Sequence, residues 1–179
     1  MAEGSFSMDA VYEKHEQSLV LNINSMPSEN SINNIKIMQG RIATNDNEAV
    51  VEEKFLKKND LKIGDEIELK SGKDTDINDN LKISTFKIVG SAMSPLYLST
   101  QRQLSSVGNG SVKGFVYILP DVFKREIYSE IYVKISNNTS NESLINNADY
   151  KSAAEIIEKS IKKLGTTRSE VRYENVIND

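Results

Sequence analysis

Acidic and amide side chains in one segment resemble the start of a calcium-binding loop. Asp74, Asp76 and Asn78 have the every-second-residue spacing with which an EF-hand loop begins. The pattern fails where its geometry is strict, because Asp79 replaces the turn glycine and Thr85 replaces the bidentate glutamate. We therefore interpret the segment as a solvated loop joining the two strands of a hairpin. A weak surface calcium site is the alternative.

Three glycines are spaced almost like those of a phosphate-binding loop. Gly108, Gly110 and Gly114 follow the pattern G-x-G-x-x-x-G. The dinucleotide fingerprint needs G-x-G-x-x-G between a strand and a helix. Here the spacing is longer and a strand-like segment follows the last glycine. We therefore predict that the glycines occupy turns that require a positive φ.

Side chains suited to covalent or acid–base catalysis are scarce. The chain has no cysteine and one histidine, which excludes a thiol nucleophile, a thiolate metal site and a site with several histidines. His15 lies in a charged segment, and no G-x-S-x-G motif is present to use it. The neighbouring pairs Glu52–Glu53 and Asp65–Glu66 lack the apolar setting that paired carboxyl catalysis needs. We predict a protein that is not an enzyme and needs no cofactor.

One apolar segment lies within a long irregular stretch over residues 91–113. It comprises Ser94, Pro95, Leu96, Tyr97 and Leu98. Long loops in compact domains often carry function, and exposed aromatic and leucine side chains can contact a partner. We predict a partner or substrate contact at this segment. The alternative is that its side chains pack back onto a sheet and anchor the loop.

The periodicity of apolar residues predicts many short strands and few helices. Strands are expected at residues 19–23, 49–51, 81–89, 115–119 and 130–136. Residues 61–69 are expected to form a turn at Gly64–Asp65 that enters another strand, and residues 35–38 are a short apolar segment. In the last strand, the alternation places Ile131 and Val133 toward a core and Tyr132 toward solvent. Helices are expected at residues 52–59 and 152–164. The predicted fold class is α+β, with mixed small sheets of short strands and two or three helices.

Composition and hydropathy limit the class of protein and its domain organisation. The 179 residues include 22 Lys+Arg and 26 Asp+Glu, so the net charge of −4 lacks the basic footprint of a nucleic-acid binder. No segment offers the roughly 20 apolar residues of a membrane-spanning helix. We predict a flexible lead or cloning remnant over residues 1–15 and an α+β domain of one unit or two small lobes over 16–165. Residues 166–179 would begin a connecting segment toward a helical extension or a membrane span.

The order and spacing of several short motifs over residues 19–136 resemble a known family. The residues that carry these motifs are Gly40, Arg41, Glu48, Gly64, Asp65, Gly90, Gly108, Asn109, Gly110, Gly114 and Tyr132. Together with the segment SPLYL they resemble the extracytoplasmic domain of FtsX-like, MacB-type ABC-transporter permeases of Gram-positive bacteria. The resemblance is weaker at both ends, and family members usually have more sequence before the first of these strands.

This resemblance implies a small α+β domain of the MacB-like periplasmic core type, without catalytic residues, at the extracellular face of the cytoplasmic membrane. Its partners would be the transmembrane helices of the permease, a cytoplasmic ABC ATPase and a peptide, lipid or cell-wall protein ligand, with no nucleic acid. The domain would couple extracellular events to the membrane helices. The alternative is a free-standing cell-surface module that binds a peptide or a glycan, and a small cytosolic enzyme is a third reading.

Overall fold

Two compact units make up the chain. The computed structural model describes residues 2–14, 17–98, 102, 104–108, 110–134, 151–152 and 155–163. One unit is Ala2–Val133, and the other comprises Lys134–Asp179 together with Met1.

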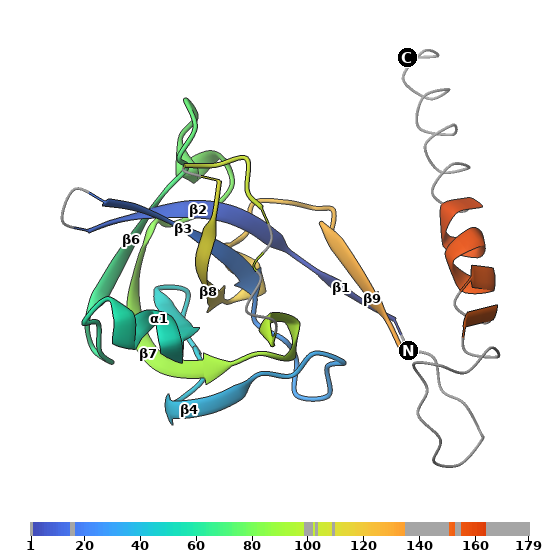
Figure 1. Cartoon of the computed structure of the whole chain (residues 1–179), viewed down its shortest axis with the longest axis horizontal. Coiled ribbons are helices and arrows are strands. Elements are labelled where there is room, and N and C mark those ends of the chain that lie inside the picture. Colours follow the sequence, from blue (N-terminus) through green and yellow to red (C-terminus); the bar gives the residue numbers. More distant parts are fainter. Residues whose placement is uncertain are drawn as a thin grey trace. The chain divides into compact units, whose positions relative to one another are not determined.

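The unit Ala2–Val133 is built mainly from strands (Figure 1). Its strands are β1 (Ala2–Ser5), β2 (Ser7–Lys14), β3 (Gln17–Ser25), β4 (Lys36–Gly40), β5 (Glu48–Glu52), β6 (Glu66–Lys70), β7 (Thr85–Met93), β8 (Val112–Ile118) and β9 (Glu130–Val133). Its helical segments are α1 (Glu53–Lys58) and the short 3-10 turns η1 (Ile77–Asp79), η2 (Pro95–Tyr97) and η3 (Pro120–Val122).

Six of these strands close into a barrel in the order β6-β2-β3-β8-β5-β7, with β7 returning to β6. Closure of the barrel depends on β7, because the two halves of this strand pair with different strands along the same edge of β7. Thr85–Lys87 pair with β6 and Gly90–Met93 with β4, while β5 runs parallel along the opposite edge. The predicted hairpin between β6 and β7 is confirmed. The predicted α+β class, with mixed small sheets and two or three helices, is wrong, because the unit is mostly β and six of its strands form one closed barrel.

Apolar side chains fill the barrel interior, as expected for a barrel of so few strands. Alternate residues of β3, β6, β7 and β8 point inward, among them Leu21, Ile23, Ile67, Leu69, Phe86, Ile88, Val116 and Ile118. The helix α1 adds Phe55 and Leu56 to this core. A Cβ at Gly114 would lie 2.8 Å from both Cβ and Cδ2 of Phe55, so the glycine in β8 makes room for that side chain.

Residues 2–14 belong to the folded unit, which corrects their assignment to a flexible lead. β2 pairs with β3 along its whole length, and Ala10 is fully buried. The side chains of Phe6, Met8 and Tyr12 pack against the same core. Their alternation, which continues through Ala10, is a period-two strand signal that the sequence-based prediction missed.

The first and last strands of the unit form a separate two-stranded ribbon, β1–β9. The predicted orientation of β9 is wrong. Ile131 is 62% exposed and Val133 is 38% exposed, whereas Tyr132 is partly buried. Because β9 pairs only with β1 among the described strands, its apolar face has no sheet to cover it. The end of the predicted strand, residues 135–136, lies outside the described residues.

In the other unit, residues 151–152 and 155–163 are helical, which confirms the helix predicted there, although Leu164 lies outside the described residues. Glu158 and Lys162 form an i,i+4 ion pair at 2.6 Å. Among the residues that the structure describes, no helix is long and apolar enough to cross a membrane. The segment predicted as a connector, residues 166–179, falls outside the described residues.

Candidate ligand-binding cleft

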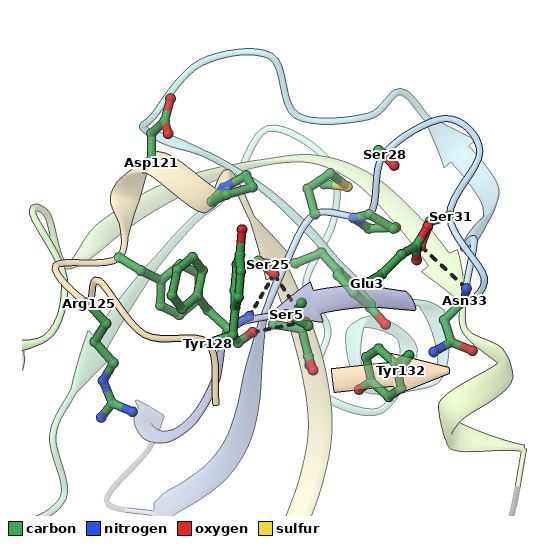
Figure 2. A pocket seen from close by; sticks show the side chains of 18 of the residues that line it. Glu3, Ser5, Ser25, Ser28, Ser31, Asn33, Asp121, Arg125, Tyr128 and Tyr132 are labelled. Carbon is green, nitrogen blue, oxygen red and sulfur yellow. Dashed lines mark hydrogen bonds between the residues drawn. The ribbon is translucent and has the colours of Figure 1, made fainter. Parts of the chain in front are cut away.

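A cleft of about 560 Å³ opens where the β1–β9 ribbon joins one end of the barrel (Figure 2). The ribbon contributes one wall through β1 and Tyr132. The barrel contributes the ends of β3 and β8, and the loop after β3 and the turn η3 complete the rim. These segments are far apart in the sequence, so only the closed fold brings them together.

Hydrogen bonds that involve serine hydroxyls connect the ribbon to the barrel next to this cleft. The hydroxyl oxygens of Ser5 and Ser25 lie 3.1 Å apart, and the Ser25 oxygen also accepts a hydrogen bond from the backbone N–H of Phe6 at 3.0 Å. Close by, Ser129 Oγ accepts from the N–H of Ser7 at 2.6 Å. The junction is therefore held by specific hydrogen bonds in addition to packing.

Glu3 makes a second connection, between the ribbon and the loop after β3. Its carboxylate accepts hydrogen bonds from the Ser31 hydroxyl at 2.7 Å and from the Ile32 N–H at 2.9 Å. The Ser31 hydrogen bond and then the Ile32 hydrogen bond lower the pKa of the Glu3 carboxyl below its ordinary value. Figure 2 shows Glu3 reaching across to Ser31 at the rim of the cleft.

Aromatic rings line two sides of the cleft. Phe6 stacks on Phe123 with ring centroids 5.3 Å apart, and Tyr128 packs on Phe6 at 4.9 Å. Tyr128 remains 56% exposed. On the ribbon, the Tyr132 hydroxyl donates to the Glu130 carboxylate, and burial raises the pKa of that tyrosine above its ordinary value. In Figure 2, Tyr128 lies near the end of β1, and Tyr132 lies on the neighbouring strand β9.

A polar network adjoins the cleft behind the turn η2. The Ser94 and Tyr117 hydroxyls lie 2.9 Å apart, and burial raises the pKa of Tyr117 to about 12. The Tyr97 hydroxyl donates to the Asn22 side chain and accepts from Asn24 Nδ2 at 3.1 Å. Burial raises the pKa of Tyr97 as well. These tyrosines are therefore neutral hydrogen-bonding groups that fix the end of the barrel.

The predicted contact segment divides between loop anchors and exposed side chains. Ser94 is buried and caps η2, and the Tyr97 ring stacks on Phe115 with centroids 4.7 Å apart. Leu98 is 75% exposed, and Leu96 is 39% exposed at the edge of the cleft. Pro95 begins the turn. The partner contact stays a prediction, and Pro95, Leu96 and Leu98 are the exposed residues of the segment that could make it.

Several family-motif residues make structural contacts where β4, β5 and β7 lie next to one another. Gly40 and Gly90 are directly opposite partners in the β4–β7 ladder. Arg41 and Glu48 form a two-point ion pair, with nitrogen–oxygen distances of 2.7 and 2.5 Å. The Asp65 carboxylate accepts from the Lys62 N–H at 3.0 Å. All of these contacts shape the backbone.

The glycines predicted to occupy turns do so at two positions. Gly108 and Gly110 have φ values of 55° and 76°, which confirms the expectation for them. The expectation is wrong for Gly114, which lies within β8 and makes room for the Phe55 side chain. Gly64 also has a positive φ, of 102°. Asn109 lies outside the described residues. Tyr132 is the motif residue that reaches the cleft.

The candidate calcium loop is organised by its own backbone. Asp76 caps the turn η1, accepting from the N–H of Asn78 at 2.8 Å. In the described part of the chain, no group of three or more acidic or histidine side chains could hold a metal ion. His15 lies outside the described residues.

Neither a protein-family model nor a curated protein matches the chain. The function proposed below therefore rests on the geometry of the unit Ala2–Val133 and on the sequence resemblance.

Proposed function

We propose that this chain is the extracytoplasmic domain of an FtsX-like, MacB-type ABC-transporter permease. In this role it performs no catalysis. It contacts a ligand or a partner protein on the extracellular side of the cytoplasmic membrane. It then couples that contact to the membrane helices and, through them, to a cytoplasmic ATPase. The sequence resemblance over residues 19–136 supplies the family.

The observation that carries this proposal is the pairing of the first strand with the last. Ala2 is the Cα partner of Val133, so the chain enters and leaves the unit at adjacent positions (Figure 1). A domain inserted between two membrane segments needs such adjacent ends. The ribbon also gives both membrane segments a direct mechanical connection to the barrel.

The attachment of the ribbon explains how movement would pass through the domain. Ser5 binds Ser25 of β3, and Glu3 binds the loop after β3. A shift of β1 relative to β9 would strain both connections, and both lie at the cleft. A ligand in the cleft and a movement of the membrane helices would therefore influence each other.

The cleft itself favours a second candidate, a free-standing cell-surface module that binds a peptide or a glycan. The two candidates differ in the residues encoded on either side of the chain. Apolar segments of about 20 residues on both sides support the permease. A signal peptide and a cell-wall anchor support the free-standing module.

A disulfide across the ribbon tests the permease proposal directly. The chain has no cysteine, so Ala2→Cys with Val133→Cys introduces a single pair. Antiparallel partners have Cα atoms about 4.5–5.5 Å apart, which suits a disulfide. In the full permease, we expect oxidation to impair transport or signalling and reduction to restore it, because the two strands can no longer shift relative to each other.

The matched control is Lys14→Cys with Gln17→Cys, which joins partners at the closed end of the β2–β3 hairpin. This second disulfide should leave activity unchanged. Full activity with the ribbon disulfide completely formed would contradict the proposed coupling.

A further inference from the structure

The size of the cleft suits a small ligand. Its volume of about 560 Å³ falls within the range of small-molecule sites, roughly 300–1,000 Å³. A folded partner cannot enter a space of this size, whereas a chain of about two or three sugar units or a short peptide can. The chemistry of the lining decides between these classes.

Aromatic rings and neutral polar groups dominate that lining. Tyr128 is supported by the Phe6–Phe123 stack, so little side-chain freedom is lost when a ligand packs against it. Serine and asparagine side chains also line it, and Ser25, Ser31 and Asn24 already hydrogen-bond within the protein. The exposed Ser28 hydroxyl and the partly exposed Asn33 amide are polar groups that the lining offers to a ligand. Such groups both donate and accept hydrogen bonds, as sugar hydroxyls do. Aromatic rings in turn pack well against the C–H faces of sugar rings.

The formal charges of the lining cancel. Lys82 and Arg125 are balanced by Glu3 and Asp121. The Glu3 carboxylate is already bound by Ser31 and Ile32, and Arg125 donates to the Asn80 side chain at 2.9 Å. The cleft therefore has no net charge with which to select an anionic or a cationic ligand.

We propose that this cleft binds a short, uncharged oligosaccharide, and that occupancy holds the β1–β9 ribbon against the barrel. The ligand would contact Tyr132 on the ribbon and Ser28 in the loop after β3 at the same time, because both line the cleft. A ligand that binds only the docked arrangement stabilises it by mass action. The binding step is independent of the permease, and the coupling step rests on the proposed function.

Titration calorimetry on the complete 179-residue chain tests the binding step, with maltotriose, cellotriose and chitotriose as probes. We expect at least one to bind with a Kd below about 1 mM. Tyr128→Ala should weaken that binding roughly tenfold or more. The control is Ile127→Ala, which alters the neighbouring side chain, 60% exposed and outside the cleft lining. It should leave the Kd unchanged.

Asn33→Ala provides a second variant of the lining in case Tyr128→Ala fails to fold, and circular dichroism checks both. No binding of any of the three sugars at about 10 mM would overturn the proposal. Equal affinity in the native chain and in a folded lining variant would overturn it too. Tighter binding of an uncharged capped trialanine than of any of the sugars would assign the cleft to peptides instead.

Hydrogen exchange at the β1 amides tests the coupling step. Saturating sugar should slow exchange at Gly4 and Ser5, and unchanged exchange would overturn the coupling. Failure to bind sugar leaves the disulfide experiment on the permease unaffected, so the two proposals fail separately.

Discussion

Gly40 and Gly90 face each other across the β4–β7 ladder, and neither position has room for a side chain. A Cβ at Gly90 would lie 2.2 Å from the carbonyl oxygen of Arg41, and one at Gly40 would lie 2.2 Å from that of Val89. Both obstacles are backbone atoms, which cannot rotate away. Two glycines that are 50 positions apart in the sequence thus allow one close approach of two strands.

We expect Gly90→Ala to destabilise the chain by about 2 kcal/mol or more, because the methyl group must displace the β4 backbone. Urea denaturation measures this change. The matched control is Gly64→Ala. Gly64 has a φ of 102° but no atom within 4 Å of its Cβ position, so only backbone strain of about 1 kcal/mol applies. An effect of Gly90→Ala no larger than that of Gly64→Ala would contradict the steric account.

Tyr97 should behave as a loop anchor when it is substituted. The ring stacks on Phe115, and its hydroxyl joins the Asn22 and Asn24 side chains. We expect Tyr97→Ala to cost about 2–4 kcal/mol and Tyr97→Phe about 1 kcal/mol. Leu98→Ala should change stability by less than about 0.5 kcal/mol, because that side chain is 75% exposed.

Thermal unfolding of the three variants under one set of conditions checks this order. If Tyr97→Ala and Leu98→Ala were equally stable, Tyr97 would not anchor the loop.

Signals between neighbouring residues were enough to predict the β6–β7 hairpin, the helix α1 and the turns at Gly108 and Gly110. The acidic start and basic end of α1 and the polar loop before β7 are signals carried by neighbouring residues. Barrel closure has no such signal. It depends on Lys87 pairing with Glu48 on one edge and Glu66 on the other, and sequence periodicity does not specify which strands become neighbours.

The cleft was missed for a related reason. Its ribbon wall comes from β1, and Phe6 and Tyr128 meet only because the first and last strands pair. The alternation in β9 correctly grouped Ile131 with Val133. It could not indicate that Tyr132, on the other face, would line the cleft.

Stability at acidic pH should depend on Glu48. Arg41 chiefly, with the Thr44 N–H and the Asn45 side chain, holds the pKa of this carboxyl well below its ordinary value of 4.5. A carboxyl with a lowered folded pKa contributes stability that is complete above the unfolded value. This contribution is lost as the pH falls toward the folded value. The native chain should therefore lose stability below about pH 4.5.

We expect Glu48→Gln to lower the Tm by several degrees at neutral pH, and the gap to the native chain should narrow as the pH falls below 4.5. Glu53→Gln is the control, because its i,i+4 pair with Lys57 is exposed and contributes little. Differential scanning calorimetry across this pH range gives the comparison. If the plots of Tm against pH for the native chain and Glu48→Gln were parallel, Glu48 would not be the group that causes the loss of stability at acidic pH.

Arg102 should contribute to the stability of the fold mainly by pairing with the buried carboxylate of Glu52. The two side chains form an ion pair and are 19% and 7% exposed, and the Arg102 guanidinium lies 5.2 Å from the centre of the Tyr97 ring. Within the described residues, Oε2 of Glu52 accepts no hydrogen bond. We expect Arg102→Met to cost about 3 kcal/mol, because it leaves a buried carboxylate unpaired.

Glu52→Leu combined with Arg102→Met should recover much of that loss, since replacing both charges removes the unpaired group. Urea denaturation of the two single variants and the double variant gives the coupling between the side chains. Additive effects would show that the pair contributes no specific interaction, and that Arg102 acts only through its contact with Tyr97.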